Sequence, residues 1–415
     1  MRKVLPALTA TLIACASFLS ADTNQDNSKG NCPEPQGCCP EKCCPAPAVK
    51  ICFPEGIAPC ARPVIVNSCG QREVQNGAII DIELLVWQAH TDDLEVGVLN
   101  SNATGHPSYA SQFTNASYQH MKFKWDAGVR LGVGYIFDHD CWDVYAAWTH
   151  FTGNASKDVV TSTSNTPSQT LFPTWSAAEV VLGTLAGDGN LTATSLDSHW
   201  KLKLDLIDLE LGREFFAGRH LAVRPHVGLR GGWIKQNFDI QYAGLTGAAV
   251  TTAFTGTLDD IEMKNDFKGI GVRTGLDTEW NVGCGFCFFG DAAISILYGR
   301  YNISQQETVG DDLFLAADTV ILSTTDSFND SKAITDLALG IRWCPDMSCW
   351  CTASRLLLSA GWEHHMFFNQ EQLKRVSTVN TTLTSGINTD NYTTYVREAG
   401  DLSTQGVTIS LRWEY

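Results

Sequence analysis

Long apolar runs are missing from this 415-residue sequence. Beyond residue 21, no stretch approaches the roughly 20 consecutive apolar residues that a membrane-spanning helix needs. Helical patterns alternating with strands, which are typical of cytoplasmic enzymes of this length, are almost absent. Methionine is scarce, with five residues, and charged residues make up only 18% of the chain. The formal net charge of -16 argues against nucleic acid as a partner and against binding anionic lipid through a basic surface.

The N-terminus has the pattern of an export signal. Residues 1–21 combine a basic start, a long apolar run and small residues at the end, which predicts a secretory signal peptide cleaved after Ala21. The alternative is a lipoprotein, because residues 12–15, Leu-Ile-Ala-Cys, fit a lipobox that would leave Cys15 as the lipidated N-terminus. The apolar run continues past Cys15, which favours the signal peptide.

The last eleven residues alternate strictly between apolar and polar. The apolar row is Val407, Ile409, Leu411, Trp413 and Tyr415. Because a period of two puts alternate side chains on opposite faces, residues 405–415 predict a strand with one apolar face. The last strand of a bacterial outer-membrane barrel has such a face and ends in an aromatic residue. We therefore interpret Trp413 and Tyr415 as the signal that the barrel-assembly machinery reads.

Similar alternation in nine further segments predicts an all-β fold over residues 78–415, a transmembrane antiparallel up-and-down β-barrel. In the fourth segment the apolar row changes phase, which predicts a β-bulge near Ile207 and Asp208. The ten segments are 78–88, 122–137, 142–151, 200–216, 221–233, 267–280, 286–301, 336–343, 355–367 and 405–415.

Long and short connections alternate between these segments, as the extracellular loops and periplasmic turns of outer-membrane barrels do. Both termini are then expected in the periplasm. Residues 170–183 and 313–322 lie in long connections and could each hide another hairpin, so twelve or fourteen strands stay open. A soluble β-sandwich with core aromatics is the competing fold, but it would not need the export signal, the terminal aromatic and alternating loop lengths together.

Aromatic residues fall near both ends of the segments, where two membrane-interface girdles would lie. We expect the periplasmic girdle to contain Tyr135, Phe137, Trp142, Phe215, Trp280, Phe286, Trp343, Trp413 and Tyr415. We expect the opposite girdle to contain Trp125, Trp148, Trp200, Trp233, Tyr298 and Trp362.

The cysteines divide into two groups. A Cys/Pro-rich segment, residues 22–77, precedes the barrel and contains Cys32, Cys38, Cys39, Cys43, Cys44, Cys52, Cys60 and Cys69. Six more fall in or beside the short connections: Cys141, Cys284, Cys287, Cys344, Cys349 and Cys351. All are then expected in the oxidising periplasm, which favours disulfides within and between chains. Their connectivity cannot be deduced from the sequence.

A metal site at the cysteines is the competing interpretation. Cys284 and Cys287 have the Cys-x-x-Cys spacing of a zinc knuckle. No second knuckle of matching spacing and no nearby histidine completes such a site, and periplasmic oxidation opposes free thiolates. We therefore expect no metal and no other cofactor.

Two stretches resemble a known family. Residues 209–234, from LELGREFF to LAVRPHVGLRGGWI, and residues 356–368, which contain SAGWE, resemble the Legionella-type major outer membrane protein family. That family also occurs in chlamydia-related bacteria, as porins similar in role to the chlamydial major outer membrane protein. The resemblance covers roughly residues 78–415 and implies a pore-forming, disulfide-linked, abundant outer-membrane protein. The Cys-rich segment departs from the barrel family generally and leans towards chlamydia-related envelopes.

Charged residues occupy the rows opposite the apolar ones and are candidates to line the pore. A water-filled lumen keeps them hydrated, whereas Arg or Lys facing lipid costs about 2–4 kcal/mol near the midplane. An excess of arginine near mid-strand predicts a weak anion preference. The alternative is a plugged lumen in which arginines and carboxylates neutralise one another. The candidates are Lys124, Asp126, Arg130, Arg224, His226, Arg230, Arg273, Asp277, Glu279, Arg342, Arg355, Glu363 and Arg412.

Catalysis is not expected. Some outer-membrane barrels are hydrolases that use paired carboxylates and a histidine at the rim. His364, His365, Asp259 and Asp260 are the residues of those types that lie near strand ends and loops, and no spacing ties them together.

These patterns predict a general diffusion porin for small hydrophilic solutes or ions that is also a disulfide-linked structural component of the outer membrane. The alternative is a closed structural barrel or adhesin whose long loops meet the host. The expected partners are outer-membrane lipid, the barrel-assembly machinery and other Cys-rich envelope proteins, and a homo-oligomer stays open.

Overall fold

The computed structural model of the chain describes most of the predicted barrel. The signal peptide and most of the Cys-rich segment predicted above lie outside the described residues. These are 77–100, 115–137, 142–161, 169–177, 192–217, 220–245, 258–283, 285–310, 319–344, 355–381 and 390–414. Among them there is no helix long and apolar enough to cross a membrane.

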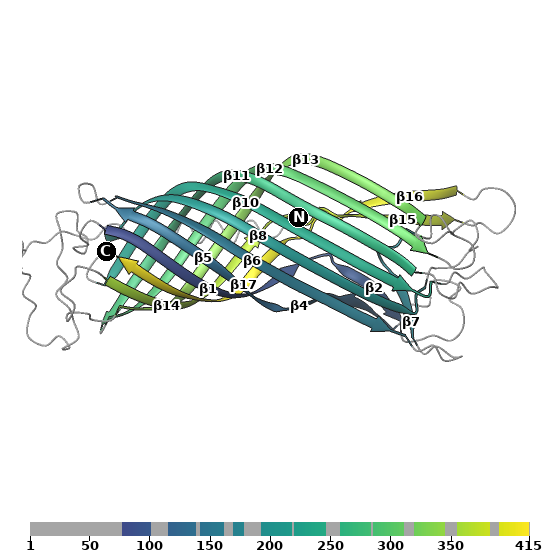
Figure 1. Cartoon of the computed structure of the whole chain (residues 1–415), viewed down its shortest axis with the longest axis horizontal. Helices are drawn as coiled ribbons and strands as arrows, with labels where there is room; N and C mark the ends of the chain where they lie inside the picture. The colour runs from purple at the N-terminus through teal and green to yellow at the C-terminus, as the bar shows by residue number, and fades with distance from the viewer. Residues whose placement is uncertain are drawn as a thin grey trace, which may run out of the picture. The chain divides into compact units, whose positions relative to one another are not determined.

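Ten long strands pair antiparallel in one closed ring (Figure 1). The ring closes where β17 pairs with β1, which brings Trp413 opposite Ile80. In ring order the strands are β1 (Gly77–Thr91), β5 (Trp125–Ile136), β6 (Trp142–Val160), β8 (Ser195–Arg213), β10 (Leu221–Ala243), β11 (Leu258–Gly283), β12 (Phe286–Gly310), β13 (Thr319–Trp343), β14 (Arg355–Phe367) and β17 (Leu402–Glu414).

The predicted antiparallel barrel of ten strands is therefore confirmed for the described residues. Within the residues that the structure describes, neither suspected hairpin adds a strand to the ring. Of residues 170–183, the short β7 (Thr170–Pro173) joins a separate sheet with β2 (Glu95–Asn100) and β3 (Ala116–His120). Residues 319–322 begin β13 itself. Four further short strands are β4 (Lys122–Phe123), β9 (Phe215–Phe216) and the hairpin of β15 (Lys374–Thr381) with β16 (Asp390–Arg397).

The two ends of the barrel differ in their connections. At one end, which we call the turn end, β1 begins, β17 ends, and short connections join β5 to β6 and β11 to β12. Gly285 has a φ of +77° in the tightest of these turns, where a side chain would also meet the Cys344 carbonyl. At the other, which we call the loop end, lie β2, β7 and the β15–β16 hairpin (Figure 1).

Near the turn end the outer wall is a band of exposed apolar side chains. On β5 the outward row runs from Trp125 to Tyr135, ten residues apart. At about 3.3 Å per residue and a tilt near 40°, that row spans roughly 25 Å, the height of the apolar band of an outer-membrane barrel.

Exposed aromatic residues border this band on both sides, as predicted, with one exception. The turn-end girdle contains Tyr135, Phe137, Trp142, Phe215, Trp280, Phe286, Trp343 and Trp413. Tyr415 lies outside the described residues. The opposite girdle contains Trp125, Trp148, Trp233, Tyr298 and Trp362. The prediction for Trp200 is wrong, because its side chain is 2% exposed and belongs to the core.

The strands continue well beyond the band, and their two faces exchange polarity as they do. On β8, Ile207, Leu209 and Leu211 face outward within the band. The same outward row continues past the band as Lys203 and Lys201, while Leu202 and Leu204 face the interior. The predicted bulge near Ile207 is therefore wrong. The register of β8 against β6 and β10 runs without a shift, and what changes at that point is the solvent outside, from lipid to water.

A hydrophobic core consequently fills the interior beyond the band. Nine of the ten ring strands contribute buried apolar side chains, among them Trp87, Phe151, Phe238, Phe267 and Tyr301. A further segment enters from the β14–β17 connection, where Gln370, Glu371 and Gln372 are fully buried. The Asn265 amide of β11 donates to the Gln370 carbonyl at 3.0 Å and to the Glu371 carboxylate at 3.2 Å. Burial of this apolar surface stabilises a barrel whose outer wall there faces water.

Because the outer wall passes from lipid to water, a leucine-to-lysine substitution should destabilise the barrel inside the band and be tolerated beyond it. Leu209 lies in the band and is 47% exposed. Leu209→Lys should therefore lower the free energy of unfolding from bilayers by about 2–4 kcal/mol. Leu258→Lys, at a leucine that is 42% exposed at the loop end, should change it by less than about 1 kcal/mol. Denaturant titration of each variant in lipid vesicles, followed by heat-modifiable gel migration, measures both. Equal effects at the two positions would contradict the assignment of the band to lipid.

Candidate functional site

The inner face of the band holds a polar cluster around a cavity of about 260 Å³. Its residues occupy the rows opposite the lipid-facing ones, so each strand that is apolar outside is polar inside. The lining carries six arginines and eleven carboxylates. It extends from Glu214 and Glu414 at the turn end to Trp87 and Leu204 at the edge of the hydrophobic core. Among the described residues, no group of three or more histidines, cysteines or carboxylates is placed to hold a metal ion.

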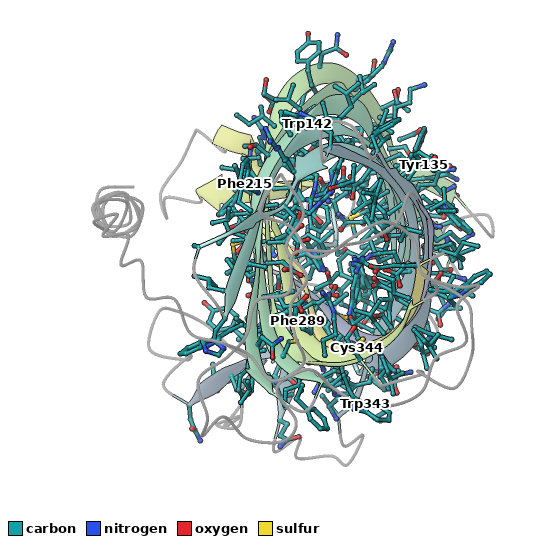
Figure 2. The ribbon with its side chains drawn as sticks, turned by 90° about the vertical axis from the view of Figure 1, so that its left-hand side faces the viewer. Tyr135, Trp142, Phe215, Phe289, Trp343 and Cys344 are labelled. Carbon is teal, nitrogen blue, oxygen red and sulfur yellow. The ribbon has the colours of Figure 1, made fainter. Side chains whose placement is uncertain are left out.

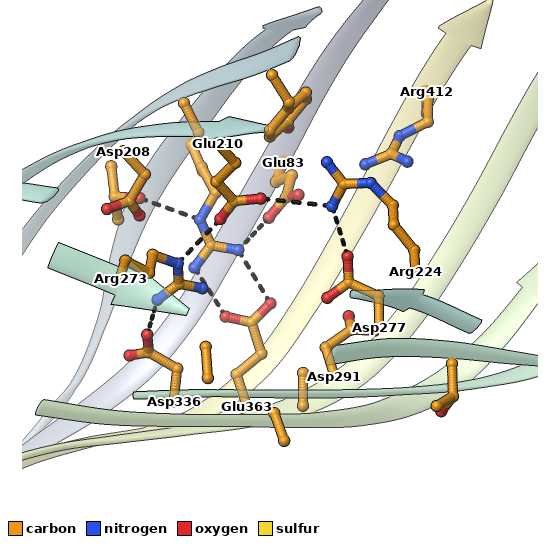
Figure 3. Close-up of a pocket in the computed structure, with 18 of the residues that line it drawn as sticks. Glu83, Asp208, Glu210, Arg224, Arg273, Asp277, Asp291, Asp336, Glu363 and Arg412 are labelled. Carbon is orange, nitrogen blue, oxygen red and sulfur yellow. Dashed lines mark hydrogen bonds and ion pairs between the residues drawn. The ribbon is translucent and has the colours of Figure 1, made fainter. Parts of the chain in front are cut away.

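Arg230 and Arg273 both bind Asp336 in one part of this network, and Figure 3 shows Arg273 between Asp336 and Glu210. Arg230 on β10 forms a bidentate pair with Asp208, with N···O distances of 2.6 and 2.8 Å, and reaches Asp336 on β13 at 2.8 Å. Arg273 pairs with Glu210 at 2.9 Å and also contacts Asp336. Strands β11 and β12 separate β10 from β13 in the ring, so these contacts cross the interior.

Arg130 makes a second bridge across the interior. Its guanidinium on β5 binds Glu363 on β14 with both terminal nitrogens, at 3.1 and 2.9 Å, and binds Glu83 at 2.5 Å. Strands β1 and β17 lie between β5 and β14. The guanidinium carbon also lies 5.5 Å from the ring centroid of Trp87, where the polar cluster meets the hydrophobic core. Bidentate arginine–carboxylate pairs are the strongest of the charged hydrogen bonds, so these bridges hold the wall rigidly.

Nearer the turn end, three further arginines are paired. Arg224 binds Asp143 and reaches Asp277 at 2.7 Å. Arg342 binds Glu279 at 2.9 Å. Arg412 binds Asp81, with distances of 3.0 and 2.8 Å.

The sequence prediction of a pore-lining set is matched in part by the positions of the side chains. Arg130, Arg224, Arg230, Arg273, Asp277, Glu279, Arg342, Glu363 and Arg412 line the cavity. His226 is buried beside it, 3.5 Å from Glu210 and 3.4 Å from Asp277. The Arg355 side chain lies outside what the structure describes.

Two of the candidates do not line the cavity. Lys124 is exposed at the surface. Asp126 accepts hydrogen bonds from the backbone and side-chain nitrogens of Asn154, at 2.8 and 3.1 Å, where β4 gives way to β5. Asp126 is paired with Trp87 in the sheet, at the loop-end border of the band and outside the cavity lining.

The predicted anion preference is not supported by the cavity. Carboxylates outnumber arginines in its lining, so its formal charge is negative. Sequence reasoning missed Asp208, Glu210 and Asp291 because it assigned a phase change to β8 and gave no role to the inward row of β12. Continuing one strict alternation from Leu196 to Gly212 would have placed Asp208 and Glu210 inside.

The residues considered for catalysis do not come together. His365 faces the interior, 2.8 Å from Asp336 and 3.0 Å from Glu363, as part of the charge network. His364 lies on the opposite face of β14. Asp260 accepts a hydrogen bond from Gln241 at 2.7 Å, and Asp259 is buried in the loop end.

A pair of buried carboxyls holds a loop segment in the loop end. Glu307 on β12 accepts hydrogen bonds from the backbone N–H of Ala177 at 2.7 Å and from the Ser176 hydroxyl at 3.3 Å. The neighbouring Trp175 is fully buried, edge-on against Phe238 at 5.6 Å. Burial and the adjacent Asp259 carboxylate raise the pKa of Glu307, and burial raises the pKa of Asp259. The pair therefore holds a proton at neutral pH.

The barrel region of the sequence, residues 73–415, matches the model of one protein family, described as the Legionella pneumophila major outer membrane protein precursor. Among proteins with curated descriptions none matches. One similar solved structure is the outer membrane protease OmpT from Escherichia coli, with 10% identity, coverage of 82% of this chain and 96% of that one, and a TM-score of 0.35. Another is a Pseudomonas aeruginosa FadL homologue, with 8% identity, coverage of 82% and 90%, and a TM-score of 0.22.

The Glu307 contact predicts that the loop segment loosens as pH rises. The folded state keeps Glu307 protonated, whereas the released carboxyl ionises above its ordinary pKa of 4.5, so stability is lost with increasing pH above that value. Amide exchange of residues 169–177, corrected for its intrinsic pH dependence, should therefore accelerate between about pH 5 and about pH 9.

Glu307→Gln should remove that acceleration, because an amide stays neutral and keeps the acceptor for Ala177. Glu262→Gln, at an exposed carboxylate on the outer face of β11, is the matched control and should behave as the unmodified chain does. Identical pH profiles for the Glu307 variant and the control would show that Glu307 does not hold the segment by its proton.

Proposed function

The chain belongs to the family of the Legionella pneumophila major outer membrane protein precursor, and we propose that within the outer membrane it is a closed structural barrel rather than an open diffusion pore. The observation that carries this proposal is the filled interior. Figure 2 looks along the ring from the turn end and shows side chains across its inside. This favours a closed structural barrel, the alternative given in the sequence analysis, over the predicted porin.

Two layers of different chemistry support closure. Across the band, arginine–carboxylate bridges cross part of the interior and connect strands that are three positions apart in the ring. Beyond it, aromatic rings are in direct contact, as in the pairs Trp87–Phe151 and Phe267–Tyr301, with centroids 5.5 and 4.8 Å apart. A hydrophobic layer resists the passage of hydrated ions because an ion would have to leave its water shell. Hydrophilic solutes would therefore meet a barrier even if they entered the cavity from the turn end.

The positions of the cysteines support a second part of the proposal, that the chain is cross-linked to other Cys-rich envelope proteins. The Cys-rich segment leads directly into β1, which begins at the turn end. The connections that contain Cys141, Cys284, Cys349 and Cys351 join strands at that same end. Cys287 and Cys344 are buried there. One end of the barrel thus gathers the thiols, as a periplasmic attachment surface would require.

Conductance tests the closed interior. The refolded mature chain, verified as a barrel by heat-modifiable migration, should give no stable open steps in a planar bilayer. Trp87→Ala combined with Trp200→Ala removes two buried rings of the core and should produce steps, with cation preference because the cavity is negatively charged. Trp233→Ala, at an outward tryptophan, is the matched control and should stay silent. Stable open steps from the unmodified chain would overturn the proposal.

Covalent cross-linking is tested separately, by electrophoresis without reductant after thiols are blocked in intact cells. The unmodified chain should migrate as species of higher mass that collapse to the monomer on reduction. A variant with serine at the eight cysteines of residues 32–69 should lose most of these species while its barrel still shows heat-modifiable migration. A monomer from the unmodified chain under these conditions would refute the cross-linking and leave the closed barrel untouched.

A further inference from the structure

Arg213 stands apart from the other arginines of the barrel. Every other arginine whose side chain is described donates a hydrogen bond to an acidic, amide, hydroxyl or backbone oxygen. Arg213 has no such partner in the described part of the chain, and its Nε is buried and unpaired. An arginine remains charged under all ordinary conditions, so this guanidinium lacks a counter-ion within the protein wall.

The side chain lies on the outer wall at the turn end. It continues the outward row of Ile207, Leu209 and Leu211, and in the sheet Arg213 is paired with Trp142. Its guanidinium carbon is 5.0 Å from the ring centroid of Phe215 and 6.0 Å from that of Trp142. Both rings belong to the turn-end girdle, and Figure 2 shows them on the same part of the rim. Cation–π contact with both rings holds the guanidinium at the edge of the lipid band.

None of the described residues supplies the missing anion, so we look for it outside the barrel. Glu210 and Glu214, the carboxylates nearest in the sequence, line the internal cavity. Glu210 is bound to Arg273. At the depth of an aromatic girdle the surroundings are lipid headgroups, whose phosphates carry the negative charge. A guanidinium offers a planar fork of donors that matches phosphate oxygens, which an ammonium does not.

We propose that Arg213, held between Trp142 and Phe215, binds the phosphate of a membrane phospholipid headgroup. The acyl chains of that lipid lie along the apolar row of Leu211 and Leu209, which follows directly from the guanidinium towards the middle of the band. Contact between the acyl chains and these leucines distinguishes a phospholipid from free phosphate, which would interact with the guanidinium alone. The Nε is buried, so the terminal guanidinium nitrogens of this half-exposed side chain are the donors that the bound phosphate meets.

Lipid titration tests this site. The full mature chain is refolded in a maltoside detergent, which carries no phosphate, and native mass spectrometry follows the binding of short-chain phosphatidylglycerol. Arg213→Gln should weaken the tightest binding event roughly tenfold, the effect of losing a charge-assisted hydrogen bond. Arg300→Gln is the matched control, because Arg300 faces outward on β12 beyond the band and donates to Ser327 at 2.8 Å. It should bind as the unmodified chain does.

Two further arms separate the sources of the anion. A short-chain diacylglycerol, which lacks the phosphate, should not compete for the site, and millimolar inorganic phosphate should not displace the lipid. Displacement by inorganic phosphate alone would overturn the proposal in favour of a general anion site. Equal lipid affinity of the Arg213 variant and the control would refute it. If Arg213→Gln does not refold, Phe215→Leu keeps the charge and removes the nearer ring, and undiminished affinity in that variant would refute the site as drawn.

Discussion

The structure depends on one constraint, the change of solvent along each strand. A strand that leaves lipid for water has to exchange its polar and apolar faces, because its outer row meets hydrocarbon first and water afterwards. On β8 the exchange falls between Ile207 and Lys203, without a break in pairing or register. The interior inverts with it, from a charge network inside the band to a hydrophobic core beyond the band. The hydrophobic core is therefore a consequence of strands that are longer than the membrane is thick.

The charge network inside the band consists of arginines paired with carboxylates. The cations lining the cavity are arginines, whose planar guanidinium can serve two carboxylates at once, as Arg130 does with Glu83 and Glu363. Burying ions is costly, and removing one partner leaves a charge uncompensated, at a cost of about 3–5 kcal/mol. Each bridge that crosses the interior thus makes its two strands depend on each other, although they are not neighbours in the sheet.

Much of this fold could be predicted from the sequence, because a period of two is a local signal. The ten strands and both girdles, Trp200 apart, follow from alternation and aromatic placement. Trp200 was misplaced because an apolar row can face lipid or a hydrophobic core, and residue type alone does not distinguish the two. The pairs in the network could not be predicted from local sequence patterns. Arg130 and Glu363, for example, are 233 positions apart and meet only when the ring is closed. For the same reason the charged rows could be predicted from the sequence. Whether these charges line a water-filled lumen or pair with one another could not.

The network also explains why the band has a polar interior at all. A barrel segment that was apolar on both faces would be equally soluble in lipid, but a shift of one residue in pairing would then cost little, and its register would be poorly specified. With Asp208, Glu210 and Arg230 inside, the same shift moves charges into hydrocarbon, at about 2–4 kcal/mol for an arginine near the midplane. Beyond the band, where a slip would expose Trp200 and Leu204 to water, the hydrophobic effect enforces the same register. The two opposite polarity patterns on one strand therefore select a single pairing, with charged side chains inside the band and apolar side chains inside the part beyond it.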